Sequence, residues 1–332
     1  MKEGNRIARA VYFVAPGRVE VREEVIENES RNGKVLFHSS LIGISHGTEM
    51  LLFNGDLPQD TVADETIEAL SGSLSYPIKY GYVNAGRTEN GMKAFAFYPH
   101  QDLFYISQSD LVEIPEALSF EDAIFLANME TALGITHDAG LRFGEDVLVI
   151  GQGIVGLLTA SILVRSGAGK VITVEKLEPR VELSRQEGFI ALNPQQVDVR
   201  EAVHELTGGR GVDAAIHTTS SSAGLQLAID CTAFEGTVIE ASWYGGKTTE
   251  VRLGEAFHRK RLTIRSSQVS TIHPALSRRW NKKRRFDRVI ELLEAVKPSR
   301  FITHRFPLHD AQRAFERIRD NPGETVQVVL EP

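Results

Sequence analysis

Three glycines in one short segment could form a site for a dinucleotide. The segment Gly151-Gln152-Gly153-Ile154-Val155-Gly156 follows the apolar run DVLVI and precedes the helical run LLTASILVRSG. In such a loop the first glycine makes a tight turn, the second lets the backbone approach a pyrophosphate, and the third lets helix and strand pack closely. Backbone amides and the helix dipole then bind the phosphates. Because the pattern alone can also be an ordinary turn, the flanking strand and helix carry the prediction.

An acidic residue after the second strand indicates which dinucleotide is bound. Glu175 ends the run KVITVE. A carboxylate at this position accepts hydrogen bonds from the adenosine ribose hydroxyls and repels a 2′-phosphate. We therefore expect NAD(H) to be favoured. Arg180 lies close by as a further candidate cofactor contact, and with Lys176 it leaves NADP(H) possible.

The runs around this loop alternate between strand and helix. Strand-like segments DVLVI, KVITVE, VDAAIHT, GTVIEAS and RLTIRSS are separated by helix-like ones, which is typical of an α/β domain with a doubly wound parallel sheet. The preceding residues are different, with short apolar runs broken by Gly, Pro and Asn, and they predict a β-rich domain. We expect a β-rich domain over 1–120, a dinucleotide domain over 121–270, and a return of the chain to the first domain over 271–332.

Composition narrows the classes of partner. The net charge of −7 over 332 residues argues against nucleic acid or anionic membranes, since these bind positive surfaces. We expect a small-molecule substrate. The absence of a long apolar run or of a secretory signal at the start favours a cytoplasmic protein. With Cys231 as the single cysteine, neither an internal disulfide nor a multi-cysteine zinc site can form.

This arrangement of segments resembles the medium-chain dehydrogenase/reductase superfamily, to which zinc alcohol dehydrogenases belong. The resemblance rests on IGISHGTE (42–49), YPIKYGYVNAGR (76–87), and METAL followed by GQGIVG. It implies a GroES-like catalytic domain completed by the C-terminal residues, a Rossmann domain, an active site between the two, and a homodimer or homotetramer. SHGTE, YPHQ and AFHRKRL…SSQVS are also similar to the branch that includes bacteriochlorophyllide dehydrogenase-like proteins, a weaker match.

The sequence departs from the superfamily where catalytic zinc would bind. Aligned on the family segments, His46 replaces the first ligand cysteine, Tyr82 and Val83 replace a His-Glu pair, and the third ligand falls near Ala127. Catalytic zinc needs three protein ligands, and here His46 alone could serve. The four-cysteine structural lobe is also missing. We expect no bound zinc.

Without a metal, a side chain must stabilise the substrate oxygen and move its proton. The resemblance places His46 and Tyr82 around that oxygen, which makes Tyr82 a candidate donor and His46 a candidate relay. Both could instead fill the vacated metal site by bonding to each other or to Glu49. His100, at the end of an apolar strand, is a further candidate for substrate contact or catalysis.

Other polar residues are candidates for cofactor or substrate contact. Thr131 in METAL matches a superfamily position near the nicotinamide, although a threonine early in a helix is often a cap. His217, Thr218 and Ser242 end parallel strands, where the ligand crevice lies. The basic run at 278–285 predicts either a solvated surface or a clamp for an anionic substrate, with Trp280 as an apolar platform.

These features leave three functions open. The first is an NAD(H)-dependent oxidoreductase acting on a secondary alcohol or ketone without zinc. The second is an NADPH-dependent enoyl or quinone reductase, against which Glu175 argues. The third is a nucleotide-binding protein without turnover.

Overall fold

Parallel strands alternate with helices between residues 128 and 292, as the apolar runs predict. The computed structural model describes every residue in this range. The strands form one six-stranded sheet in the order β11-β10-β9-β12-β13-β14. The strands are β9 (Val147–Ile150), β10 (Val171–Val174), β11 (Ile190–Leu192), β12 (Val212–His217), β13 (Thr232–Glu240) and β14 (Thr263–Ser266). The order reverses between β9 and β12, which makes these two strands the switch point of a doubly wound sheet.

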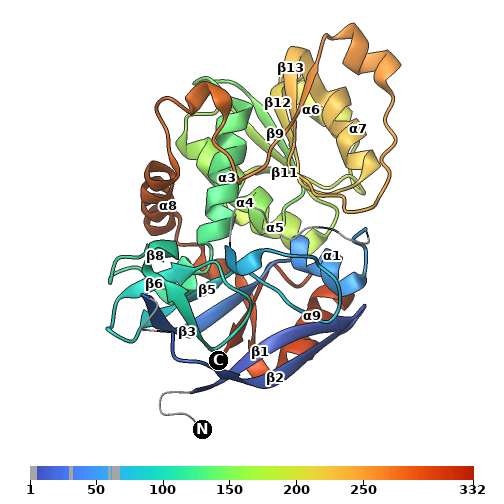
Figure 1. The fold of residues 1–332 in the computed structure, drawn as a ribbon. Coiled ribbons are helices and arrows are strands. Elements are labelled where there is room, and N and C mark those ends of the chain that lie inside the picture. The colour runs from blue at the N-terminus through green and yellow to red at the C-terminus, as the bar shows by residue number, and fades with distance from the viewer. Residues whose placement is uncertain (1–5, 30–32, 59–60, 62–67) are drawn as a thin grey trace. The chain divides into compact units, whose positions relative to one another are not determined.

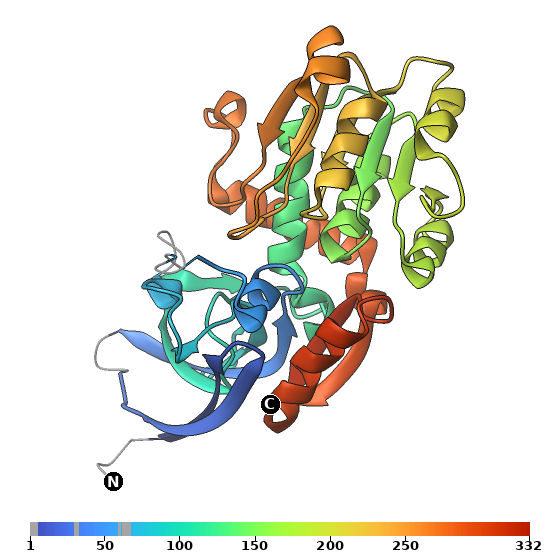
Figure 2. The same cartoon turned by 90° about the vertical axis from the view of Figure 1, so that its right-hand side faces the viewer.

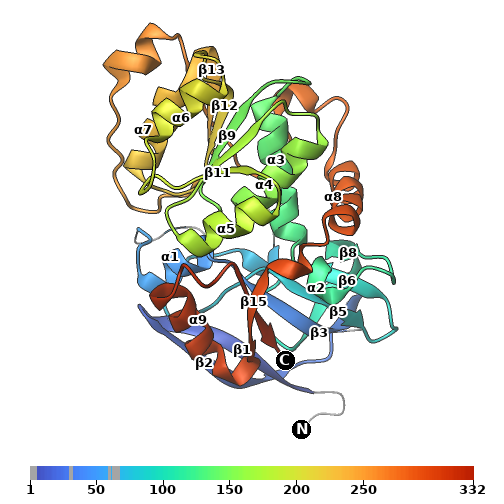
Figure 3. The same cartoon turned by 180° about the vertical axis from the view of Figure 1, so that it is seen from behind.

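Helices cover both faces of this sheet. They are α3 (Leu126–Ala139), α4 (Ile154–Arg165), α5 (Glu178–Gln186), α6 (Val199–Leu206), α7 (Ser222–Cys231) and α8 (Lys282–Val296). Figures 1 and 3 show α6 and α7 on one face, and α3 and α4 on the other. Leu148 and Ile150 pack with Val203 and Leu225 in one buried cluster, so β9 is covered as a parallel strand requires. Among the described residues, no helix is both long and apolar enough to span a membrane.

The other unit is rich in antiparallel strands. The structure describes residues 6–29, 33–58, 61 and 68–332. The N-terminal strands are β1 (Arg6–Ala15), β2 (Arg18–Ile26), β3 (Lys34–Ile44), β4 (Ile78–Lys79), β5 (Asn84–Thr88), β6 (Lys93–Ala96), β7 (Leu103–Ser107) and β8 (Leu111–Glu113), with helices α1 (Thr48–Asn54) and α2 (Phe120–Ala123). Loops between these strands carry the candidate catalytic residues.

The C-terminal segment completes this unit. It supplies β15 (Ile302–Pro307), α9 (Ala311–Asp320) and β16 (Gln327–Glu331). β16 pairs antiparallel with β3, with Val328 opposite Ile44, and Figure 2 shows α9, in red, beside β15. Phe315 of α9 lies 5.2 Å, between ring centroids, from both Phe13 and Phe53. Burial of these three rings holds the chain ends together.

The boundaries between the units differ from those expected at 120 and 271. The structure divides the chain into Met1–Ala127 with Leu293–Pro332, and Asn128–Leu292. Much of the predicted return segment therefore belongs to the dinucleotide unit. One physical reason is Arg285, which is 2% exposed and forms an ion pair of 2.5 Å with Glu130 of α3. A buried ion pair of this kind requires both partners, so it fixes the start of α8 to α3.

Candidate functional site

The glycine loop has the backbone geometry that the dinucleotide interpretation requires. Gly151 follows β9 with a φ of +96°, and a Cβ added to it would lie 2.6 Å from Thr218 Oγ1. A Cβ on Gly156 would lie 1.9 Å from the Gly151 carbonyl oxygen, so side chains are excluded at both positions. At Gly153, the N-cap of α4, the nearest atom to an added Cβ is Arg180 Nη1 at 3.6 Å. The loop therefore leaves open backbone at the start of a helix, which suits a pyrophosphate.

The remaining loop residues contribute their backbone. Gln152 is fully buried, and its side-chain amide donates to the carbonyls of Val149 and Gly151. Ile154 is also buried, whereas Val155 is partly exposed. A contact of Ile154 with a cofactor would therefore come from its backbone amide, because its side chain packs into the domain. The Gln152 amide donates to Glu175, so the predicted contact of Gln152 with a cofactor stays a prediction.

The structure brings Glu175 to the glycine loop. Its Oε2 accepts a hydrogen bond of 3.0 Å from the Gln152 amide, and its Oε1 accepts bonds from the amides of Lys176 and Leu177. Arg180 Nη1 lies 3.9 Å from Glu175 Oε2. The carboxylate is thus held at the end of β10, where an adenosine ribose would lie. The charge of Arg180 is turned toward this carboxylate and the loop.

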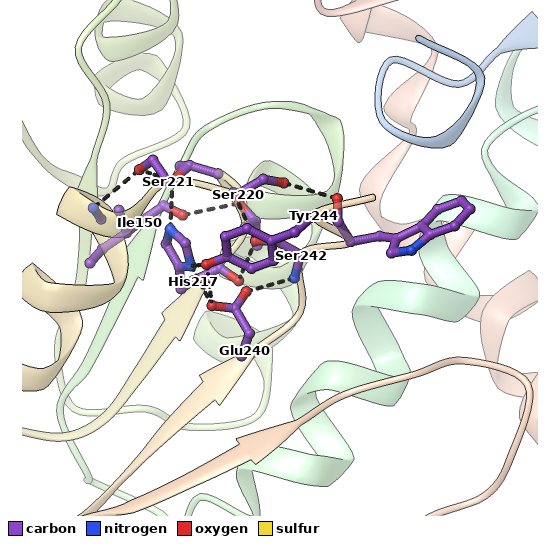
Figure 4. Close-up of polar contacts among 11 residues, drawn as sticks. Ile150, His217, Ser220, Ser221, Glu240, Ser242 and Tyr244 are labelled. Atoms are coloured by element: carbon purple, nitrogen blue, oxygen red, sulfur yellow. Dashed lines mark hydrogen bonds and ion pairs between the residues drawn. The ribbon is translucent and has the colours of Figure 1, made fainter. Parts of the chain in front are cut away.

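On the other side of the switch point, a hydrogen-bonded array joins the ends of β12 and β13 (Figure 4). His217 is fully buried; its Nδ1 lies 2.7 Å from Glu240 Oε2 and its Nε2 lies 2.5 Å from Thr219 Oγ1. The Tyr244 hydroxyl donates to the same Glu240 oxygen at 2.9 Å. We call Tyr244, Glu240, His217 and Thr219 the strand-end array. Of these residues, the strand ends in the sequence pointed to His217 but not to Glu240 or Tyr244, although a glutamate ending the apolar run GTVIE was a signal for Glu240.

The pKa values within the array fit a carboxylate held by proton donors. Burial opposes the ionised form of Glu240, but hydrogen bonds from His217 and Ser242 outweigh it and lower its pKa. The pKa of Tyr244 is raised, first by burial and then by the hydrogen bond to Glu240. At neutral pH Glu240 is therefore a carboxylate and Tyr244 a neutral donor.

Thr218 and Ser242 form hydrogen bonds to the backbone of the loops beside the array. Thr218 Oγ1 donates to the carbonyl of Ile150 at 3.0 Å, and Ser242 Oγ accepts from the Ser220 amide at 3.0 Å. Both lie at the strand ends, as expected, with their hydroxyls bonded to backbone. Thr131 lies on α3, partly buried, and its predicted cofactor contact stays a prediction.

In the first unit, Glu49 and His100 form a buried pair. Both side chains are 0% exposed, and Glu49 Oε2 lies 2.7 Å from His100 Nε2. Glu49 lies in α1, and His100 follows β6. The His100 ring is thus buried and bonded to Glu49, and its contact with a substrate stays a prediction.

Tyr82 lies near the same pair. Burial, followed by the charge of Glu49, raises the pKa of Tyr82 to about 12, against the effect of hydrogen bonds from Ser45 and Thr48. The phenol therefore stays protonated over the neutral and mildly alkaline range and can act as a proton donor. His46 lies in the turn before α1 and is partly exposed. The unit thus brings Tyr82 to Glu49, with His46 three residues before Glu49 in the chain.

Half of the cations in the basic run at 278–285 have an ion-pair or ring contact within their own unit. Arg285 is buried on Glu130, and Lys283 Nζ lies 2.9 Å from Asp287 Oδ2. The guanidinium of Arg284 lies 4.4 Å from the centroid of the Trp280 ring. These contacts favour the solvated-surface alternative over a clamp for an anionic substrate.

Comparisons with known proteins agree with this description. Residues 155–293 match the family model described as zinc-binding dehydrogenase. D-guloside 3-dehydrogenase of Escherichia coli (strain K12) is 28% identical over 189 residues, which cover 57% of this chain and 54% of that protein. D-xylulose reductase of Saccharomyces cerevisiae is 27% identical over 234 residues, covering 69% of this chain and 63% of that protein. The alignments thus span about half to three fifths of these relatives' own length.

Solved structures show the same fold over nearly the whole chain. 2R,3R-butanediol dehydrogenase from Bacillus subtilis superposes with a TM-score of 0.80 at 19% identity, covering 98% of this chain and 99% of that one. An alcohol dehydrogenase from Thermus sp. ATN1 gives a TM-score of 0.77 at 23% identity, covering 97% and 99%. At this identity the likeness establishes the fold, a GroES-like β-rich domain with a Rossmann domain.

Proposed function

Because this chain belongs to the medium-chain dehydrogenase/reductase superfamily, we propose that it is an oxidoreductase that transfers a hydride between NAD(H) and a secondary alcohol or ketone. The observation that carries the proposal is the open glycine loop with Glu175 bonded to its amide. The names of the relatives, a guloside dehydrogenase and a xylulose reductase, favour a polyol or sugar hydroxyl as the substrate.

The residues present fit a nicotinamide dinucleotide. The amides that follow Gly153, at the start of α4, would bind the pyrophosphate, and Glu175 would accept hydrogen bonds from the adenosine ribose. When bound, the cofactor supplies or accepts the hydride, so the chain's own residues must orient the substrate and move a proton.

A screen of polyols, sugars and their ketones with NAD(H), followed by NADH absorbance, tests this function. We expect turnover with at least one polyol and ketose pair. Reduction of conjugated C=C bonds with NADPH and no alcohol activity would favour an enoyl or quinone reductase instead. NADH binding without turnover of any compound would favour a protein that only binds nucleotides.

The position of Glu175 predicts that NAD(H) binds at least about tenfold more tightly than NADP(H), because a 2′-phosphate would face a carboxylate. Glu175→Gln should reduce this difference to about twofold or threefold, since it removes the charge and keeps the side-chain size. Titration of NADH and NADPH by cofactor fluorescence measures both ratios.

Glu178→Gln is a matched control for this titration. Glu178 lies in the same connection, but its side chain is 49% exposed and pairs with Arg185. It should leave the NADH to NADPH ratio unchanged. Equal or tighter binding of NADPH by the wild-type protein would mean that Arg180 and Lys176 dominate, and the preference for NAD(H) would be wrong.

We also propose that the enzyme works without catalytic zinc, because the donor set does not fit that metal. At the aligned ligand positions stand His46, Tyr82 and Ala127, and the nearby Glu49 oxygen is bound to His100. Tyr82 remains a protonated phenol and Ala127 has no donor atom. Tetrahedral zinc sites use thiolate, imidazole or carboxylate ligands, so this set offers one suitable ligand.

Elemental analysis of the purified protein should therefore find no stoichiometric zinc, and activity should survive a chelator. A tightly bound catalytic metal would be removed slowly and would take the activity with it. About one zinc per chain, lost together with activity, would show that other residues supply the ligands and would contradict the proposal.

A further inference from the structure

The strand-end array lies where a bound dinucleotide would carry its nicotinamide. In the parallel sheet, Ile150, His217 and Glu240 are register partners on β9, β12 and β13. Glu175 lies on the opposite side of the switch point, at the end of β10, and would hold the adenosine end. A dinucleotide that starts at Glu175 and crosses the glycine loop must extend its other end over β12 and β13. This placement rests on the proposed cofactor function.

The array also fixes the Glu240 carboxylate. A carboxylate only accepts hydrogen bonds, so the proton on the His217 Nδ1 side points to Glu240. The other ring nitrogen, Nε2, lies 2.5 Å from Thr219 Oγ1, which lies 2.8 Å from Ser221 Oγ. The Glu240 carboxylate is thus held by three donors, which are His217, Tyr244 and the Ser242 amide at 2.8 Å.

The nicotinamide ring is positively charged in NAD⁺ and neutral in NADH. We propose that Glu240, fixed by His217 and Tyr244, is a positioning residue that favours the oxidised cofactor over the reduced one through its charge. Neighbouring strands lie about 4.8 Å apart, so β13 is about 10 Å from β9. At an effective dielectric constant of about 20 to 40, a unit charge about 10 Å away changes affinity about fourfold to sixteenfold.

This preference has a consequence for the chemistry. Tighter binding of NAD⁺ relative to NADH lowers the reduction potential of the bound couple. Through its charge, Glu240 would therefore favour carbonyl reduction over alcohol oxidation on the enzyme. The carboxylate takes no part in the bonds that form and break.

The test measures binding and needs no knowledge of the substrate. NADH is titrated by fluorescence, and NAD⁺ by calorimetry or competition, on the full chain at neutral pH and low salt. Glu240→Gln should weaken NAD⁺ binding relative to NADH binding by about fourfold to sixteenfold. Glu240→Asp keeps the charge and should retain most of the preference. Glu235→Gln is the matched control, because it removes a charge from the same strand at a side chain that is 58% exposed, and it should leave the ratio unchanged.

Circular dichroism establishes that each variant is folded. If Glu240→Gln does not fold, the double variant His217→Gln with Glu240→Gln removes the same carboxylate and lets two side-chain amides bond each other. This double variant should weaken NAD⁺ binding relative to NADH binding by the same factor. A ratio within twofold of the wild type in a folded uncharged variant would overturn the inference. Failure of the wild-type protein to bind either nucleotide would overturn the proposed function itself.

Discussion

Tyr82→Phe is expected to lower kcat about 100-fold to 10,000-fold, the usual span for lost acid–base catalysis. We propose that the Tyr82 hydroxyl donates a hydrogen bond to the substrate oxygen. The pKa of Tyr82, raised to about 12, keeps the phenol protonated, so it has a proton to donate. NADH affinity should change little, because the glycine loop belongs to the other unit.

His46 is proposed as the second part of this relay, because histidine exchanges protons with solvent near neutral pH whereas tyrosine does not. His46→Gln should therefore lower kcat over a similar range, and the effects of the two variants should not be additive. Kinetics with the polyol or ketose found by screening, together with NADH titration, measure both effects.

Tyr98→Phe serves as the control for the loss of a phenol hydroxyl. Tyr98 lies in the same unit, and its ring stacks on Phe104 at 3.8 Å between centroids. Phenylalanine keeps this ring and removes only the hydroxyl, so turnover should be unaffected. If Tyr82→Phe and His46→Gln both fold and turn over within a few-fold of the wild type, the relay is wrong. The two residues would then be structural, as the alternative interpretation of the sequence holds.

His100→Ala is expected to reduce the free energy of unfolding of the first unit by about 3 to 5 kcal/mol. Glu49 and His100 are both fully buried and joined at 2.7 Å, so removing the imidazole leaves a buried carboxyl group without its partner. The same loss is expected for Glu49→Ala. Denaturant unfolding, followed by tyrosine fluorescence or circular dichroism, measures the change.

A double-mutant cycle separates the interaction energy between Glu49 and His100 from the effect of each residue alone. Glu49→Ala combined with His100→Ala should cost clearly less than the sum of the single variants, since neither polar group then remains unpaired. A matched control is Glu116→Ala. The Glu116 side chain is 69% exposed and pairs with Arg87, so this substitution should reduce the free energy of unfolding by less than about 1 kcal/mol. Additive single effects of less than 1 kcal/mol each would contradict a stabilising pair.

Each of the two units carries a carboxylate–histidine contact among its described residues. Glu49–His100 lies in the unit that the superfamily resemblance assigns to the substrate, and Glu240–His217 lies at the strand ends of the dinucleotide unit. The first is predicted to stabilise the loop segments around Tyr82. The second is predicted to act on the cofactor through charge. Stability and cofactor ratio are separate measurements, so each assignment is tested independently.

Local sequence was sufficient for the parallel sheet and the glycine loop of the dinucleotide unit, though not for its boundaries. The glycine loop depends on residues within about 25 positions of one another: the turn at Gly151, the helix start at Gly153 and the strand end at Glu175. Buried parallel strands can be predicted because they occur as continuous apolar runs. The predicted parallel sheet is confirmed. The place of Gly156 also follows from local sterics, since only glycine avoids the Gly151 carbonyl.

The contacts that give the sites their chemistry depended on tertiary structure. His100 meets Glu49 across 51 positions of the chain, Arg285 meets Glu130 across the boundary expected at 271, and Glu240 meets His217 on a neighbouring strand. The sequence by itself determined which segments become strands, helices and a glycine loop, because these follow from short-range periodicity and backbone sterics. Which buried charges become partners was decided by packing alone, because a polar side chain in the interior must be paired by whatever group the fold brings within hydrogen-bonding distance.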